Sequence, residues 1–169
     1  TNHVRMIDQR RLPTSLEYLT IEDAGQMASA IREMAIRGAP ALGVAGAFGI
    51  ALQAVKSQNL DRTALKDQLK QAAAELIAAR PTAVNLSWGV NQVISVLDDA
   101  VMSSEDVTRK IVTRALELAE EDVSTNLRLA EQGASLITDG DTIIHHCNTG
   151  SLAVVDWGTA LGAIRFAHE

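Results

Sequence analysis

The sequence predicts a mostly α-helical protein that begins with a short β arm and ends with the first strand–loop–helix unit of an α/β domain. Two short apolar runs come first, and five segments with apolar residues at helical spacing follow them between residues 24 and 133. After residue 133 the pattern changes to an apolar run, a loop and one more helical segment. We therefore expect a β arm over residues 1–21, a helical domain over 22–133 and an incomplete second domain over 134–169.

The β arm is expected from apolar runs at residues 4–7 and 18–21, which flank Leu12 and Pro13 and suit a small hairpin or an extended arm. Residues 20–23 resemble a capping box, with aspartate in the place where glutamate is usual, and they predict a helix start. Gly38 and Pro40 predict the end of this first helix.

The second helical segment, residues 41–57, is apolar on every side and carries a glycine at every third position, at Gly43, Gly46 and Gly49. Each glycine costs a helix about 1 kcal/mol relative to alanine, so three of them need a reason. One interpretation is the close approach of a neighbouring helix, and the other is a backbone surface beside a ligand. The uncharged run over residues 38–55 approaches the length of a membrane span, but its glycines and Pro40 favour a buried core helix.

Three further helices are predicted over residues 61–79, 83–100 and 103–133, and together the five suggest an α-helical bundle. Residues 142–146 then indicate a short buried strand, residues 147–150 a loop and residues 151–167 a helix. Because a single parallel strand is not stable without a partner, we expect the rest of the sheet in a longer form of the protein or on another chain.

The composition narrows the function classes. The chain of 169 residues has 15 basic and 21 acidic side chains, a formal net charge of -6 and no basic stripe, which argues against binding nucleic acid or a membrane surface. Its single cysteine, Cys147, excludes an internal disulfide framework. Residues 1–11 are polar and do not resemble a signal peptide, so we expect a cytoplasmic protein.

Two arginines are candidates for binding phosphate, because Arg37 and Arg80 each come just before a predicted helix start. The free N–H groups at a helix start attract anions, and a guanidinium suits phosphate. The alternative is a pair of solvated arginines at helix ends.

Cys147 is the candidate nucleophile, because it follows a predicted strand at the edge where α/β sheets bind ligands. Helix-start amides and the imidazoles of His145 and His146 could make its thiol reactive, although a lone cysteine is more often a small core residue. Adjacent residues of a strand point to opposite faces, so the two histidines do not suit one ion and we expect no metal.

Four segments carry a resemblance to a known family: residues 34–44 with an Arg-Gly-Ala-Pro motif, residues 80–86 with Trp88 behind them, residues 146–153 around Cys147, and residues 158–162. Residues 7–9 and 12–13 agree as well. In this order and over essentially the whole chain, the sequence resembles the N-terminal half of methylthioribose-1-phosphate isomerases, which are related to regulatory subunits of translation initiation factor 2B.

The resemblance implies a helical N-terminal domain joined to a Rossmann-like domain, of which this chain would hold only the first β-loop-α unit. It implies conversion of 5-methylthioribose 1-phosphate to 5-methylthioribulose 1-phosphate in methionine salvage, an amino-acid biosynthesis route, by a homodimer without a cofactor. The implied residues are the catalytic Cys147, the substrate- and phosphate-binding Arg37, Gly38, Ala39 and Arg80, and a supporting loop of Asn148, Thr149 and Gly150.

The catalytic aspartate of the family lies in a later segment that residues 1–169 do not contain, so we expect the isolated chain to be inactive. The sequence departs from the family at His145, where threonine is common, and at residues 154–157, where small residues and an aromatic are more usual. Two alternatives stay open. A ribose-1,5-bisphosphate isomerase would share the cysteine and the phosphate site, and a noncatalytic regulatory subunit would keep the fold but generally lose the cysteine motif.

Overall fold

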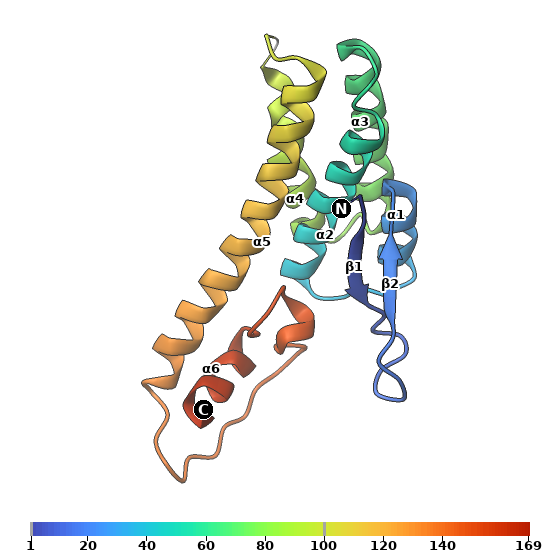
Figure 1. Cartoon of the computed structure of the whole chain (residues 1–169). Coiled ribbons are helices and arrows are strands. Elements are labelled where there is room, and N and C mark those ends of the chain that lie inside the picture. The colour runs from blue at the N-terminus through green and yellow to red at the C-terminus, as the bar shows by residue number, and fades with distance from the viewer. Residues whose placement is uncertain (1, 100) are drawn as a thin grey trace.

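A computed structural model describes residues 2–99 and 101–169 as a helical bundle with a β hairpin on one side and a short helical segment below it (Figure 1). Strands β1 (Val4–Ile7) and β2 (Tyr18–Ile21) pair antiparallel, with Val4 opposite Ile21 and Ile7 opposite Tyr18. Val4, Met6 and Leu19 pack against the core from one face of this hairpin. The predicted β arm is therefore confirmed as a hairpin.

Helix α1 (Ala24–Arg32) begins three residues later than the predicted capping box would place it. The N-cap is Asp23, whose carboxylate accepts a hydrogen bond from Gln26 N at 2.9 Å. The Gln26 side chain in turn accepts from Glu22 N at 2.9 Å. The reciprocal pattern of a capping box is present, but it involves residues 22, 23 and 26 instead of residues 20–23.

Helices α2 (Ala39–Lys56) and α3 (Arg62–Ala79) match the predicted segments within two residues. Pro40 lies in the first turn of α2, where its missing N–H breaks no helical hydrogen bond. At the start of α3, Asp61 caps the helix by accepting from Thr63 N and Ala64 N at 2.9 Å each. Most of α2 is buried inside the bundle, so this apolar helix, although long enough to cross a membrane, is a core helix as predicted.

The glycines of α2 serve close helix packing. A Cβ atom at Gly43 would lie 2.9 Å from the carbonyl oxygen of Asn85, and one at Gly46 would lie 2.8 Å from Leu86 Cδ1. At Gly49 the neighbour is Leu76 Cδ1 of α3, at 2.9 Å. The first of the two interpretations is therefore confirmed: α3 and α4 approach α2 so closely that side chains at these positions would collide with them.

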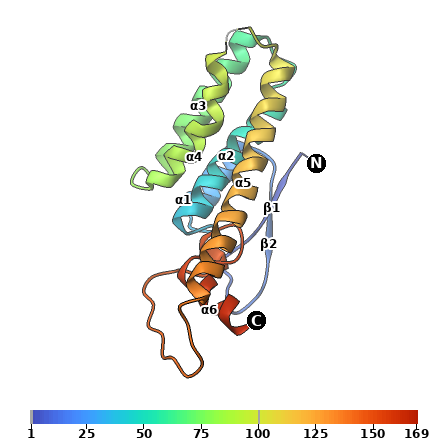
Figure 2. The same ribbon diagram turned by 90° about the vertical axis from the view of Figure 1, so that its left-hand side faces the viewer.

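The second half of the bundle consists of α4 (Val84–Ile94), the 3-10 helix η1 (Ser95–Asp98) and the long helix α5 (Ser104–Ala134). The predicted fourth helix is thus α-helical only to Ile94, and its expected end at residue 100 lies outside the described residues. Ser103 caps α5 by accepting from Asp106 N at 3.1 Å. Figure 2 shows α5 running the length of the molecule to the segment that follows residue 134.

The segment after α5 differs from the prediction. Residues 141–146 form neither helix nor strand, so the expected strand over residues 142–146 and with it the β-loop-α unit are absent from the described structure. A strand exists only through its ladder bonds to a neighbour, and the hairpin on the other side of the bundle does not supply them. Ile144, which the prediction places in a sheet, is 94% exposed.

The predicted helix over residues 151–167 is divided into the 3-10 turn η2 (Ser151–Ala153) and helix α6 (Ala160–His168). Trp157 and Gly158 separate them with positive φ angles of 71° and 94°, which a continuous helix does not allow. Helix α6 packs on α5, where a Cβ atom at Gly133 would lie 2.6 Å from Ala163 Cβ.

Candidate active site

The loop that carries Arg37, Gly38 and Ala39 lies directly against η2. Gly38 is the N-cap of α2 and has a φ of 103°, a conformation that favours glycine. A Cβ atom at this position would lie 2.3 Å from Ala153 Cα. Arg37 and Ala39 on either side of it are exposed. The backbone contact of Gly38 therefore brings the first sequence motif next to the segment that follows Cys147.

A second link between the same two segments comes from the end of β1. The side-chain amide of Gln9 donates a hydrogen bond to Leu152 O at 2.9 Å, and its main-chain N–H donates to Ala35 O at 2.9 Å. One residue thus holds the chain just before Arg37 and just after the Cys147 loop.

Cys147 lies in an exposed loop with a backbone φ of 76°. Residues other than glycine rarely adopt this left-handed conformation, and such strain is concentrated at functional sites. Asn148 beside it is exposed as well. The structure thus presents the thiol at the surface of the described residues.

The loop around Cys147 is closed from its far end. Thr149 O accepts a hydrogen bond from Thr159 N at 2.8 Å, and Thr149 Oγ1 shares one with His145 Nδ1 at 3.1 Å. Gly158 packs so closely that a Cβ atom there would lie 2.8 Å from Thr149 O. Gly150 lies beneath Leu161, whose Cδ2 would be 3.2 Å from a Cβ atom. The turn at residues 157–159 therefore fixes the shape of the cysteine loop.

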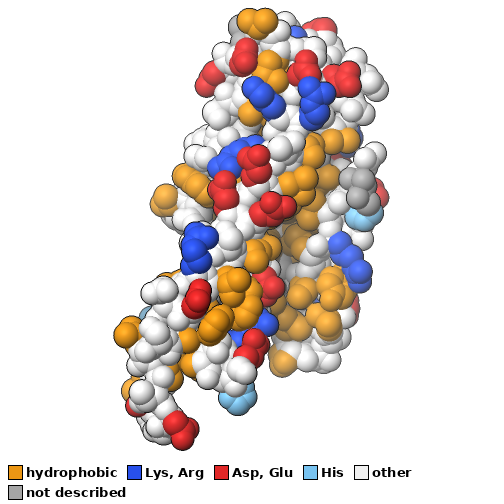
Figure 3. All heavy atoms as spheres, turned by 60° about the vertical axis from the view of Figure 1, so that its left-hand side comes forward, with side chains coloured by type: hydrophobic (Ala, Val, Ile, Leu, Met, Phe, Trp, Pro, Cys, Tyr) orange, Lys and Arg blue, Asp and Glu red, His pale blue; other side chains and the backbone are white. Residues whose placement is uncertain are grey.

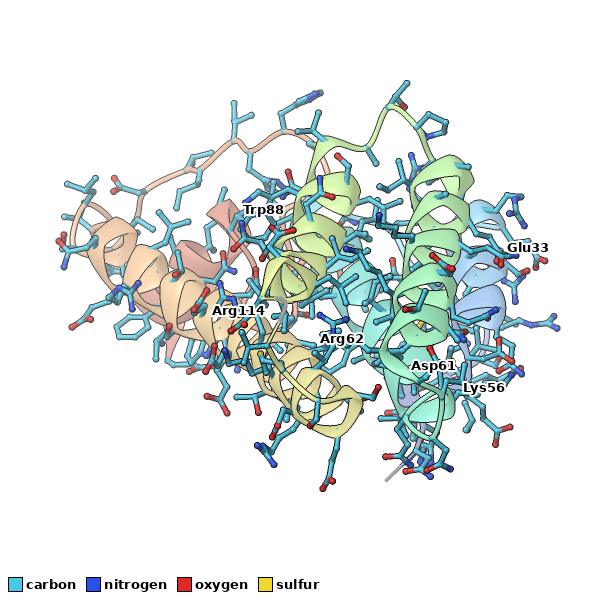
Figure 4. All side chains as sticks on the ribbon, turned by 90° about the horizontal axis from the view of Figure 1, so that it is seen from above. Glu33, Lys56, Asp61, Arg62, Trp88 and Arg114 are labelled. Carbon is cyan, nitrogen blue, oxygen red and sulfur yellow. The ribbon has the colours of Figure 1, made fainter. Side chains whose placement is uncertain are left out.

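Arg80 is half-buried at the end of α3, and its carbonyl accepts from Ala83 N at 3.0 Å in the turn that leads into α4. The packing of α4 on α2 is parallel, because Gly43 meets Asn85 while Gly46, one turn on, meets Val90. In Figure 2 both helices begin toward the end of the bundle that faces residues 135–169. Trp88 projects from α4 on the side away from α3 (Figure 4) and is half exposed.

The electrostatic character of this end follows from the helix directions. Each helix start carries a partial positive charge on free N–H groups, so two parallel helices that begin together favour an anion in front of them. Arg37 comes two residues before α2 and Arg80 four residues before α4. The structure joins the first and third sequence motifs by direct contact, and it joins the second to the first through the packing of α4 on α2.

Asp122 on α5 holds the segment after η2, since its carboxylate accepts a hydrogen bond from Val155 N at 2.7 Å. Burial raises the pKa of Asp122 above its ordinary value, and the hydrogen bond from Val155 opposes this effect only in part. The sequence analysis did not single out Asp122 or assign a role to Gln9. A signal existed for Asp122: it lies with Asn126 on the otherwise apolar stripe of α5 that includes Leu118 and Ala130.

An apolar cavity of about 280 Å³ lies behind the two joined loops. The hairpin, α2 and η2 line it, and its lining includes Ile36, Phe48 and Leu152. Figure 3 shows apolar side chains gathered between α5 and the hairpin on this side of the molecule. Within residues 2–99 and 101–169, no three histidine, cysteine, aspartate or glutamate side chains lie close enough to hold a metal ion.

The comparison with known families gives one match. The model of the initiation factor 2 subunit family matches residues 35–169. Methylthioribose-1-phosphate isomerase from Synechococcus sp. is 43% identical over 99% of this chain and 48% of its own length. Methylthioribose-1-phosphate isomerase 2 from Pseudothermotoga lettingae is 46% identical over 97% of this chain and 47% of its own length. The chain thus spans about half the length of these curated relatives.

Two solved structures share the fold. The 5-methylthioribose 1-phosphate isomerase from Pyrococcus horikoshii matches with a TM-score of 0.94 and 37% identity, covering 99% of this chain and 47% of that one. A protein described as the delta subunit of translation initiation factor eIF-2B from Archaeoglobus fulgidus matches with a TM-score of 0.89 and 44% identity, covering 99% and 49%. The predicted relationship to both groups of proteins is confirmed.

Proposed function

The chain belongs to the initiation factor 2 subunit family, and we propose that it forms part of an isomerase that converts 5-methylthioribose 1-phosphate to 5-methylthioribulose 1-phosphate. The relatives with 43% and 46% identity carry the name of this enzyme. The observation that supports the proposal is the contact of Gly38 with Ala153, because it joins the loop that carries Arg37 to the segment that follows the exposed Cys147.

In this proposal the phosphate lies in front of the parallel starts of α2 and α4. Arg37 and Arg80 bind its oxygens, and the N–H groups around Gly38 and Ala39 complete the site. Because phosphate contacts form equally in the substrate and the transition state, they hold the sugar in place and lower KM more than they raise kcat.

The reaction moves hydrogen from C2 to C1 of the sugar and changes no net oxidation state. The bond between C1 and the ring oxygen breaks and the ring oxygen takes a proton. The C2 hydroxyl loses its proton as C2 becomes a ketone, and the hydrogen from C2 goes to C1. We assign the thiol of Cys147 to the transfer at C2, and we assign ring opening to a carboxylic acid near the ring oxygen. We propose that this acid belongs to a segment outside residues 1–169, so we expect the chain by itself to be inactive.

Asn148, Thr149 and Gly150 support Cys147 in this proposal, since the bonds of Thr149 to Thr159 and His145 give the loop its shape. We further propose that residues 134–169 begin a Rossmann-like domain, and that the enzyme is a cytoplasmic homodimer of methionine salvage that uses no cofactor.

Phosphorus NMR tests the function. The chain is first extended at its C-terminus by the second half of a related isomerase. This longer protein is incubated with 5-methylthioribose 1-phosphate. We expect a new ketose 1-phosphate signal, which the Cys147→Ala variant does not produce. The same signal from both proteins would remove Cys147 from the mechanism, and no turnover by a folded protein would contradict the proposed substrate. Ribose 1,5-bisphosphate is the next substrate to assay.

A second candidate function is a noncatalytic subunit of an initiation-factor complex, which the similarity to the protein described as eIF-2B subunit delta favours. Cys147 in its strained loop argues for catalysis, because a purely structural role does not call for an exposed thiol at a φ of 76°. If neither sugar phosphate is converted, this candidate gains support.

A further inference from the structure

We infer that Gln9 is a positioning residue that fixes the Arg37 loop relative to the Cys147 loop. The inference rests on the isomerase proposed above and adds to it a residue that touches neither the substrate nor the thiol. Its hydrogen bonds reach Ala35 O, two residues before Arg37, and Leu152 O, five residues after Cys147. The bond to Leu152 spans 143 residues of sequence and is partly buried.

The residues on both sides of Gln9 are themselves held by hydrogen bonds and an ion pair. Its neighbour Asp8 continues the hairpin by donating from its main-chain N–H to Glu17 O at 2.9 Å. The buried carboxylate of Asp8 accepts two hydrogen bonds of 2.8 Å from the guanidinium of Arg10, which also forms an ion pair with Glu33 at the end of α1. The hydrogen bonds from Arg10 lower the pKa of Asp8, so this carboxylate stays charged and the pair stays formed at neutral pH.

The path from Gln9 to the cysteine is short. Leu152 lies in η2, whose turn is closed by the hydrogen bond from Ala153 N to Gly150 O at 3.0 Å. Gly150 is the last residue of the cysteine loop, and Thr149 before it is bonded to Thr159 from the other side. Gln9, through Leu152, and Thr159, through Thr149, therefore both hold the chain on the C-terminal side of Cys147.

The amide of Gln9 suits a positioning role. It does not titrate, and one of its N–H groups donates a hydrogen bond to Leu152 O. Without this donor, Leu152 O loses its hydrogen bond, and η2 is then held by the contact with Gly38 and by the hydrogen bond of the neighbouring Val155 N to Asp122. Misplacing a catalytic group by a fraction of an ångström lowers the rate of the chemical step while leaving the phosphate contacts intact.

The test uses Gln9→Met, which keeps the length of the side chain but removes the donor, and Gln58→Met as the matched control on an exposed glutamine between α2 and α3. Hydrogen exchange and alkylation of Cys147 by iodoacetamide are measured on the 169-residue chain. In Gln9→Met we expect the amides of Ala153 and Thr159 to exchange roughly five- to tenfold faster, which is the range that the loss of one hydrogen bond allows. We expect the alkylation rate of Cys147 to change, and the control to match the wild type in both measurements.

Turnover is measured in the longer protein. For Gln9→Met we expect kcat to fall roughly tenfold or more while KM stays within about twofold, because the phosphate site is kept and the thiol is misplaced. An unchanged kcat overturns the inference. Faster exchange throughout the chain, with activity lost in proportion to the folded fraction, assigns Gln9 a general structural role and also overturns it.

The two hypotheses fail in different ways. If the wild type does not convert the substrate, the proposed function is wrong, but exchange and alkylation still decide whether Gln9 orders the cysteine loop. If Gln9→Met does not fold, Gln9→Asn replaces it, because this variant keeps the amide and withdraws it by one methylene from Leu152 O. It is judged by the same measurements.

Discussion

Gly38 and Ala153 meet backbone to backbone, with only 2.3 Å left between Ala153 Cα and the position that a Cβ atom at Gly38 would occupy. The two residues belong to sequence motifs more than a hundred residues apart, and their contact joins the loop of Arg37 to the segment after Cys147. Because both sides of the contact are main chain, neither can move aside as a flexible side chain would.

Replacement of Gly38 by alanine is expected to separate the two loops. The positive φ strains any side chain, and the clash with Ala153 adds to it, so we expect a loss of about 3 kcal/mol in the free energy of unfolding. In the longer protein, activity falls by roughly 100-fold or more, because the thiol leaves its place beside the phosphate site. Urea unfolding and phosphorus NMR measure the two effects.

Gly140→Ala is the matched control for this variant. Gly140 also has a positive φ, of 88°, but nothing lies within 4 Å of a Cβ atom there. It therefore carries only the backbone strain, of about 1–2 kcal/mol, and should leave turnover unchanged. Equal losses of activity in both variants would show that the contact of Gly38 with Ala153 has no special role.

Gly89→Ala is expected to force α2 and α4 apart. A Cβ atom at Gly89 would lie 2.0 Å from Gly43 O, which belongs to a helical backbone, so we expect destabilisation of about 3 kcal/mol. Gly25→Ala in α1 is the control, since its nearest neighbours are side-chain atoms at 3.5 and 3.7 Å. This variant should gain about 0.5 kcal/mol from the better helix propensity of alanine. Thermal unfolding that ranks Gly89→Ala at or above the wild type would contradict the packing.

The helices could be predicted from the sequence because their signals are local. Asp61 and Ser103 cap α3 and α5 where the chain itself supplies the next N–H groups, and the apolar spacing sets the buried faces. The strand over residues 142–146 could not be settled in this way, because a strand depends on a neighbour and the sequence of one strand does not supply it.

The same difference between local signals and distant contacts applies to the candidate site. The sequence predicts Arg37, Arg80 and Cys147 as site residues because their motifs are continuous in sequence. Gln9 acts through Leu152 and Asp122 through Val155, and each contact exists only after distant segments have packed together. Sequence spacing predicts no such pair, although a polar residue on an apolar helix stripe marks Asp122 as unusual.

The two arginines are expected to act on binding. Arg37→Gln and Arg80→Gln should each raise KM roughly tenfold or more with a smaller change in kcat, because hydrogen bonds between charged groups contribute about 1.5–3 kcal/mol. Arg32→Gln, at the exposed end of α1, is the control with the same change of charge and should leave KM within twofold of the wild type, as expected of an exposed charge outside the predicted site. Steady-state kinetics that show the same KM in all three variants would exclude phosphate binding by Arg37 and Arg80.

The last prediction concerns Asp122 and pH. Because burial raises the pKa of Asp122, the folded state binds its proton more tightly than the unfolded state does. The stability of the folded state therefore falls as pH rises from the ordinary value of 3.8 through the raised pKa. Above the raised pKa, the ionised carboxylate destabilises the folded state. Asp122→Asn keeps an oxygen to accept from Val155 N but does not titrate. Relative to the wild type, this variant should therefore become more stable as pH rises from about 4 to 7.

Asp141→Asn provides the control of opposite sign. Hydrogen bonds from Thr138 N and Oγ1, at 2.8 and 2.9 Å, lower the pKa of Asp141, so its contribution to stability is present above the ordinary pKa and is lost as pH falls through the lowered one. Asp141→Asn should fall furthest below the wild type in stability near neutral pH. In acid its stability should approach that of the wild type. Urea unfolding of the three proteins at several pH values measures both trends. A stability difference for Asp122→Asn that does not change with pH would mean that the carboxylate is not held in a desolvated position on α5, and that its hydrogen bond to Val155 is made in contact with water.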